Sequence, residues 1–80
     1  MHVAVEISLY PLSDGYIPPI KAFIERVRAQ PGLRVVTNSM STQVSGDLAA
    51  VMPALQEEMA VTFGRPHRSV FVMKVLGGGG

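Results

Sequence analysis

Apolar and polar residues alternate over the first segment of the chain, residues 2–10. A period of two is typical of a β-strand with one buried face, and Pro11 ends the pattern. A helical period follows the Ser13-Asp14-Gly15 cluster, whose residues favour turns and helix starts, and Pro31-Gly32 ends that helix. The apolar stripe of this first helix consists of Ile17, Ile20, Phe23, Ile24 and Val27.

Three further strands are predicted in the second half of the chain. Residues 33–37 and 41–45 predict a hairpin that turns through Asn38–Met40, and residues 68–76 predict the last strand. With one helix before the hairpin and one after it, the order is βαββαβ. Right-handed crossovers then give a four-stranded antiparallel sheet with both helices on one face. The predicted fold class is therefore α+β, with the architecture of a ferredoxin-like sandwich.

The second helix lies between the hairpin and the last strand. Gly46-Asp47 supplies its cap, and Gly64 and Pro66 end it. Pro53 lies beyond the first turn, where its ring removes a backbone donor, so a kink or a missing hydrogen bond is expected. The apolar stripe of this helix is predicted to be Leu48, Val51, Met52, Leu55, Met59 and Phe63, and Glu57-Glu58 is predicted to lie on its solvated side.

Composition narrows the class of protein. Eighty residues support one domain, residues 1–76, followed by a flexible glycine tail, residues 77–80. The absence of cysteine excludes disulfides and thiolate metal sites, and a net charge of +1 makes nucleic acid a poor partner. No window approaches the roughly 20 apolar residues of a membrane span, and MHVAVEISLY lacks the basic leader of a signal peptide. We therefore expect a cytoplasmic protein.

Low charge also predicts self-association. Only 16% of the residues are charged, and the last strand is apolar on both faces, with Val70 and Val72 on one side and Phe71, Met73 and Val75 on the other. An antiparallel sheet with one wet face normally alternates cleanly. We therefore expect a second copy to cover the free face in a homo-dimer or tetramer. The alternative is a monomer that leaves an apolar face open.

Most chemistries known on this kind of fold lack their residues here. The loop after the first strand, PLSDGYIPP, has no basic residue for a phosphate, and STQVS has no aromatic side chain to stack on RNA bases. His2 and His67 lie far apart in the sequence and have no nearby carboxylate pair, so we predict no metal site. No histidine is placed to activate a serine, so we predict no catalytic residues, no cofactor and no enzymatic activity.

The hairpin region is the best candidate for a small-molecule site. Small hydroxyl and amide groups suit hydrogen bonding to the edge of a flat heteroaromatic ring. Tyr10 and Tyr16, on either side of the loop after the first strand, are candidates to stack on such a ring. The alternative is an ordinary polar turn. The residues of this cluster are Thr37, Asn38, Ser39, Met40, Ser41, Thr42 and Gln43.

Two segments resemble a known family. Ser8-Leu9-Tyr10-Pro11-Leu12, and Ser41-Thr42-Gln43-Val44-Ser45 running into Gly46-Asp47, are similar in order and spacing to the signatures of the YkoF-like family of thiamine/hydroxymethylpyrimidine-binding proteins. The resemblance covers residues 2–76. It implies a ferredoxin-like, homo-oligomeric domain that binds thiamine or its hydroxymethylpyrimidine moiety without transforming it. Carried over by position, the polar site residues are Ser8, Tyr10, Ser41 and Thr42.

The charge of thiamine adds a further candidate. Its cationic thiazolium would favour a carboxylate, and Glu6 shares a strand face with Ser8 and Tyr10. Neither motif contains Lys or Arg, which favours an unphosphorylated ligand. A salt bridge from Glu6 to Arg34, Arg68 or Lys74 is the alternative. The predicted ligand-binding set is Glu6, Ser8, Tyr10, Thr37, Ser39, Met40, Ser41 and Thr42.

The predicted function is that of a carrier, buffer or sensor in thiamine metabolism. The alternative is a structural or regulatory oligomerisation module without a small-molecule ligand, in which the hairpin is only a turn.

Overall fold

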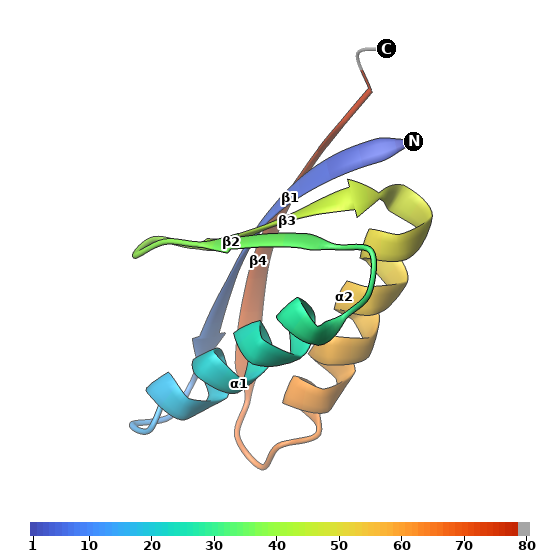
Figure 1. Cartoon of the computed structure of the whole chain (residues 1–80). Helices are drawn as coiled ribbons and strands as arrows, with labels where there is room; N and C mark the ends of the chain where they lie inside the picture. Colours follow the sequence, from blue (N-terminus) through green and yellow to red (C-terminus); the bar gives the residue numbers. More distant parts are fainter. Residues whose placement is uncertain (79–80) are drawn as a thin grey trace.

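The computed structural model describes residues 1–78. Its elements follow the order βαββαβ (Figure 1). They are β1 (His2–Pro11), α1 (Ile17–Ala29), β2 (Arg34–Thr37), β3 (Thr42–Asp47), α2 (Leu48–Phe63) and β4 (Ser69–Gly77). The strands form one antiparallel sheet in the order β2-β3-β1-β4, and both helices cover the same face. The predicted fold class, an α+β ferredoxin-like sandwich, is confirmed.

The element ends differ from the predictions by one or two residues. Pro11 belongs to β1, because at this position the strand pairs Ser69 of β4 and the missing proline N–H leaves that pairing intact. Gly77 pairs with Val3 in β4, so the predicted tail begins at least one residue later. The remainder of that tail, residues 79–80, lies outside the described residues. Tyr16 occupies the cap position of α1 without a side-chain hydrogen bond, so the Ser13-Asp14-Gly15 cluster does not cap this helix.

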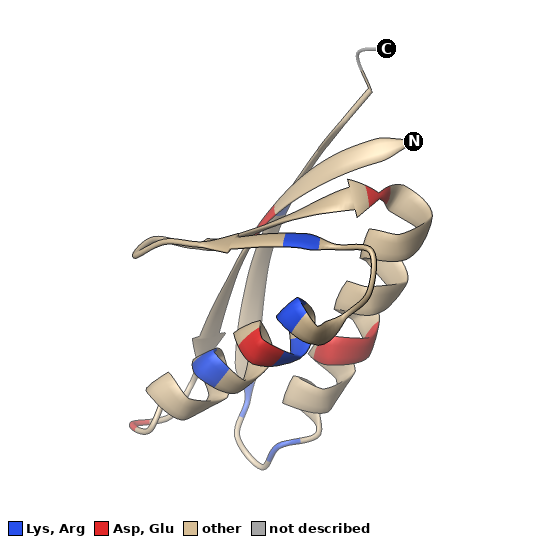
Figure 2. Cartoon of the chain, in the orientation of Figure 1, with Lys and Arg blue, Asp and Glu red and all other residues tan. Residues whose placement is uncertain are grey.

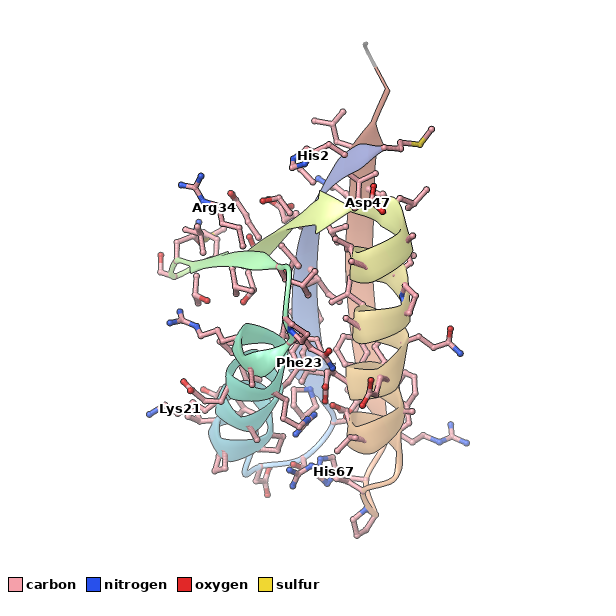
Figure 3. All side chains as sticks on the ribbon, turned by 45° about the vertical axis from the view of Figure 1, so that its right-hand side comes forward. His2, Lys21, Phe23, Arg34, Asp47 and His67 are labelled. Carbon is pink, nitrogen blue, oxygen red and sulfur yellow. The ribbon has the colours of Figure 1, made fainter. Side chains whose placement is uncertain are left out.

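The core lies between the sheet and the two helices. Every second residue of β1 points into it, as the alternation predicts, and Val5 and Ile7 are almost fully buried. Phe23 extends from α1 into this layer, whereas Lys21 points away from it (Figure 3). The ring of Phe71 on β4 lies 4.9 Å from that of Phe23, in a tilted arrangement typical of aromatic pairs.

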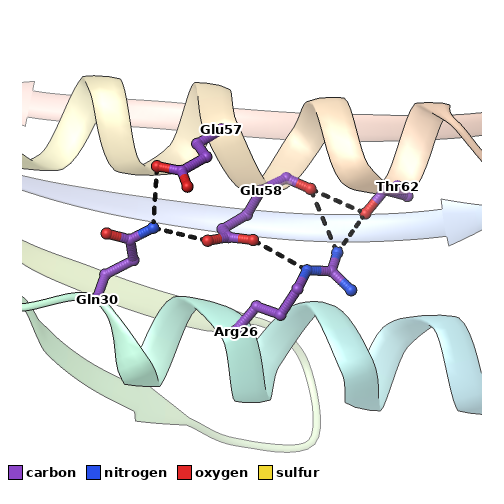
Figure 4. A network of polar contacts seen from close by, with 5 residues as sticks. All are labelled: Arg26, Gln30, Glu57, Glu58 and Thr62. Carbon is purple, nitrogen blue, oxygen red and sulfur yellow. Dashed lines mark hydrogen bonds and ion pairs between the residues drawn. The ribbon is translucent and has the colours of Figure 1, made fainter.

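A polar network joins the two helices (Figure 4). The guanidinium of Arg26 on α1 donates from Nε to Oε1 of Glu58 on α2 at 2.9 Å, and from Nη2 to Oγ1 of Thr62 at 2.9 Å. Gln30 donates to the second carboxylate oxygen of Glu58 at 2.6 Å. Glu58 is only 6% exposed, so its predicted place on a solvated helix face was wrong. A carboxylate can be buried there because both of its oxygens accept hydrogen bonds.

Asp47 and Pro53 are the two residues of the second helix for which the sequence predicts a special role. Asp47 caps it, since its side chain accepts from the Ala49 N–H at 3.2 Å. The N-terminal ammonium of Met1 donates to the same carboxylate at 2.8 Å and, together with the Ala49 N–H, lowers the pKa of Asp47 below its usual value. The helix runs unbroken through Pro53, which is exposed. Of the predicted stripe, Val51 and Leu55 are buried, whereas Leu48 and Phe63 at the helix ends are exposed.

The outer face of the sheet, on the side away from the helices, carries exposed apolar residues. Few strand residues are charged (Figure 2), and the register places Tyr10 beside Val70, Ser8 beside Val72 and Ala4 beside Leu76. Val70, Val72 and Leu76 are 45%, 51% and 74% exposed. Both faces of β4 are therefore apolar. Over residues 1–78, neither helix has the length and apolar character to cross a bilayer.

Candidate functional site

A pocket lies at the end of the sheet where β1 extends beyond β3. The pairing of these strands stops at Ile7 and Thr42, while β1 continues to Pro11. In Figure 1 the tip of the β2–β3 hairpin extends to the left, and α1 and the end of β1 lie below it. The hollow between these elements has a volume of about 170 Å³. Its lining is Ile7, Ser8, Leu9, Tyr10, Ile20, Phe23, Ile24, Thr37, Asn38, Ser39, Met40, Ser41 and Thr42.

Seven of the eight predicted site residues line this pocket. Two come from β1 and five from the hairpin, and about a third of the chain separates these segments. The fold thus brings the two sequence motifs to one place. That these residues bind a ligand stays a prediction. The seven residues are Ser8, Tyr10, Thr37, Ser39, Met40, Ser41 and Thr42.

The eighth residue, Glu6, does not line the pocket. It lies on the outer face of the sheet, where its carboxylate is 3.9 Å from Nζ of Lys74. Both side chains are well exposed, so this salt bridge contributes little. Of the two interpretations of Glu6, the structure thus shows the cross-strand ion pair. Tyr16 also lies outside the pocket, because it precedes α1 on the exposed side of the loop.

The hairpin tip holds its shape through one side chain. Oδ1 of Asn38 accepts from the N–H of Met40 at 2.8 Å and from that of Ser41 at 2.9 Å. The Asn38 N–H in turn donates to the Ser41 carbonyl. These bonds form an Asx-type turn, which satisfies the backbone of the tip without help from other elements. They leave the hydroxyl groups of Ser39 and Ser41 free for a ligand.

Thr42 has the most buried polar side chain of the pocket. The residue is only 4% exposed, and it points to the helix side of the sheet at the first residue of β3, where the pairing with β1 ends. Within residues 1–78, the buried side-chain polar atoms that lack a hydrogen-bond partner are Nε2 of His67 and Oγ of Ser69. The Thr42 hydroxyl, which makes no hydrogen bond to these residues either, is therefore accessible from the pocket that Thr42 lines. A hydroxyl that is accessible from the pocket and has no protein partner can donate to a ligand or accept from it.

Two contributions of α1 to the site were missed in the sequence. Ile20, Phe23 and Ile24 form the apolar floor of the pocket. Their helical spacing assigned them to the core, and nothing in that pattern distinguishes core from pocket floor. Arg28 donates to the Thr37 hydroxyl at 3.1 Å, which brings a cation to the rim. The two motifs contain no basic residue, so they give no sign of the positive charge that Arg28 of α1 contributes.

The pocket is neutral. None of its lining side chains is a carboxylate, a lysine, an arginine or a histidine. The arrangement offers an apolar floor, hydroxyl and amide groups at the sides and a tyrosine, which suit reversible binding of an uncharged flat ring. It contains no pair of titratable groups of the kind that general acid–base catalysis uses.

Two other hollows and both histidines lie outside this pocket. Two larger hollows, of about 440 and 510 Å³, lie on the outer sheet face beside Glu6 and at the loop before β4. Neither gathers the residues of the two sequence motifs. His2 and His67 lie at opposite ends of the molecule (Figure 3). Within the part of the chain that the structure describes, no three His, Asp or Glu residues are grouped closely enough to hold a metal ion.

The architecture and the edge pocket define a class: small α+β sandwiches of the ferredoxin-like kind with a neutral pocket between sheet and hairpin. The chain belongs to the YKOF-related family, whose sequence profile matches residues 2–67. The family resemblance noted in the two motifs is thereby confirmed. No curated protein sequence matches the chain.

Solved structures show the same fold. Hypothetical protein MJ1052 of Methanocaldococcus jannaschii is 28% identical, with a TM-score of 0.84 over 98% of this chain and 81% of that one. Protein SP2199 of Streptococcus pneumoniae is 22% identical, with a TM-score of 0.77 over 99% and 89%. TM0486 of Thermotoga maritima, a candidate thiamine biosynthesis or salvage protein, is 18% identical, with a TM-score of 0.69 over 94% and 82%. This chain therefore spans most of the length of each.

Proposed function

We propose that this protein binds thiamine, or its hydroxymethylpyrimidine moiety, without transforming it. The observation that carries the proposal is the pocket itself, in which two motifs distant in sequence surround one neutral hollow of about 170 Å³. Membership of the YKOF-related family and the likeness to TM0486 point to the same vitamin. The protein would act in the cytoplasm as a carrier, buffer or sensor.

The size of the pocket favours the pyrimidine half of the vitamin. An apolar cavity of about 150 Å³ in another protein accommodates one benzene ring. A hollow of about 170 Å³ therefore has room for one six-membered ring but not for both rings of thiamine. The thiazolium would extend toward solvent past the exposed side chains of Tyr10 and Met40.

The charges around the pocket favour an unphosphorylated ligand. A neutral lining suits an uncharged pyrimidine, which loses little hydration on entering it. Arg28 lies at the rim, but its guanidinium already donates to Thr37 and is exposed to solvent, which screens its charge. A non-catalytic role agrees with the lack of a titratable pair among the lining residues.

The outer sheet face supports a homo-oligomeric form of the same protein. Val70, Val72 and Leu76 form an exposed apolar row on β4, next to Tyr10 of β1. A second copy packed on this row would remove it from water, which favours association by roughly 25 cal/mol per Å² of apolar surface. The same row supports a second candidate function, an oligomerisation module that acts through its partner alone.

Calorimetric titration separates the two candidate functions. The full protein is titrated with thiamine and, in parallel, with free hydroxymethylpyrimidine. Saturable heat at micromolar concentrations with the pyrimidine, and a similar affinity for thiamine, is expected if one ring occupies the pocket. Absence of heat with either compound, from protein that is folded by circular dichroism, would refute ligand binding and favour the oligomerisation module.

Sedimentation velocity tests the assembly. Val72→Lys places a charge in the apolar row and is expected to convert an oligomer into monomer, because a buried unpaired charge is costly. Val61→Lys on α2 is the matched control, since Val61 is 47% exposed and lies on a helix. Equal sedimentation of both variants and the parent chain would refute the use of this face.

A further inference from the structure

The backbone of β1 presents alternate residues to its two neighbours. Just beyond the last β1–β4 pair, the Leu12 N–H donates to the Arg68 carbonyl at 2.8 Å. Just beyond the β1–β3 pairs at the other end of the strand, the Met1 carbonyl accepts from the Leu48 N–H at 2.8 Å. In an antiparallel sheet, the N–H and C=O of one residue point to the same side and the side alternates along the strand. Even-numbered residues of β1 therefore bond to β4, and odd-numbered residues bond to β3. Leu9 belongs to the second group.

Within residues 1–78, no strand residue lies opposite Leu9 on the β3 side. The β1–β3 pairing ends at Ile7 and Thr42, and in the same register the next partner of Leu9 would be Met40. Met40 lies in the hairpin turn instead, and its N–H donates to Asn38. No other hydrogen bond between backbone groups of the described residues involves Leu9 on this side. Its N–H and C=O thus face the pocket that Leu9 lines, although the residue is only 8% exposed.

We propose that the N–H and C=O of Leu9 form the hydrogen-bonding edge that recognises the 4-aminopyrimidine ring of the ligand. The inference rests on the proposed function and specifies how the site reads its ring. In a 4-aminopyrimidine, a ring nitrogen that accepts lies next to an amino group that donates. The Leu9 N–H donates to the ring nitrogen, and the Leu9 C=O accepts from the amino group. The ring edge thereby takes the place of the absent strand residue opposite Leu9.

Hydrogen bonding through Leu9 predicts strong selectivity between 4-aminopyrimidines and 4-oxopyrimidines. Hydroxyl groups of Thr42, Ser39 or Ser41 rotate, and each can donate or accept as the ligand requires. The backbone of a strand cannot exchange its donor and acceptor. A 4-oxopyrimidine has the opposite pattern, because its ring nitrogen carries a proton and its oxygen only accepts. Its ring N–H would face the Leu9 N–H, and its oxygen would face the Leu9 C=O. A site in which Leu9 makes the hydrogen bonds therefore rejects the 4-oxopyrimidine, whereas a site in which hydroxyl groups make them tolerates it.

The test compares two compounds that differ only at this edge. The full protein is titrated by calorimetry with 4-amino-5-hydroxymethyl-2-methylpyrimidine and with its 4-oxo analogue. The analogue is expected to bind about 100-fold more weakly, as for two buried polar groups left without partners. In ¹⁵N-labelled protein, amide hydrogen exchange at Leu9 should slow on addition of the amino compound. Exchange at Ile7, whose N–H is already bonded to Thr42, should not change and is the internal control.

The outcomes distinguish this inference from the proposed function. Tight binding of the amino compound, rejection of the oxo analogue and protection of the Leu9 amide support both. Binding of the two compounds within about threefold, with unchanged exchange at Leu9, would overturn the assignment to Leu9 and leave ligand binding intact. Binding of neither compound would overturn both.

Discussion

The hydroxyl of Thr42 offers the most informative single perturbation. The side chain is nearly buried, lies against the pocket and has no hydrogen-bond partner among residues 1–78. Thr42→Val replaces this hydroxyl by a methyl group of the same shape. The substitution therefore removes one hydrogen-bonding group from the site without opening a cavity in the core.

The substitution is expected to weaken binding and to leave stability nearly unchanged. Loss of one neutral hydrogen bond to ligand costs about 1.4 kcal/mol at the upper end of the usual range, which weakens affinity about tenfold. The ligand-free protein loses no hydrogen bond within residues 1–78. Its free energy of unfolding should therefore stay within about 0.5 kcal/mol of that of the parent chain. Calorimetric titration and urea denaturation measure the two quantities on one sample.

Thr62→Val is the matched control for this prediction. Thr62 is also buried, but its hydroxyl donates to the Glu58 carbonyl at 3.2 Å and accepts from Arg26 at 2.9 Å, far from the pocket lining. The same substitution there should cost about 1–2 kcal/mol of stability and leave affinity unchanged. If Thr42→Val instead destabilises the protein by that amount and binds ligand as well as the parent chain, its hydroxyl is structural and our interpretation of the pocket is refuted.

Three further predictions follow from other contacts. Glu58→Ala should lower the free energy of unfolding by about 3 kcal/mol, because it leaves the part-buried Arg26 unpaired. Glu57→Ala, on the exposed side of α2, should lower it by less than about 0.5 kcal/mol. Equal urea midpoints for the two variants would contradict this prediction. Arg28→Gln should change the affinity for the unphosphorylated pyrimidine by less than about twofold, and a phosphate ester that binds tenfold tighter only in the parent chain would contradict an unphosphorylated ligand. Folding lowers the pKa of Asp47, so its charge stabilises the fold above the unfolded pKa, and this contribution is lost as the pH falls through the folded pKa. In thermal melts, Asp47→Asn should be less stable than the parent chain at pH 7 and equally stable at about pH 2. A difference that stays constant with pH would refute this linkage.

The fold followed from the sequence because its elements depend on local patterns. The alternation of β1 and the helical period of α1 survive in the structure, and Asp47 caps α2 as its type and position predict. Glu58 shows the limit of this reasoning. Its burial depends on Arg26 and Gln30, which approach from another helix, and no pattern within α2 records them.

The candidate site was predictable in part for the same reason. Polar hairpin residues and the first-strand motif are visible in the sequence, and the fold brings them together. Glu6 was included because it shares a strand face with Ser8, but a shared face does not imply a shared pocket when the pocket lies beyond the end of the neighbouring strand. The free edge of Leu9 depends on where β3 begins, which side-chain patterns do not determine to a single residue.

The turn at Asn38 has a consequence for the kinetics of binding. Since Oδ1 of Asn38 already satisfies the N–H groups of Met40 and Ser41, the hairpin tip is folded before any ligand arrives. Association then requires no loop ordering, so its entropic penalty is small and its rate should not be limited by a conformational step. If the protein binds a pyrimidine as proposed, differences in its affinity between ligands are determined mainly by how fast the ring leaves.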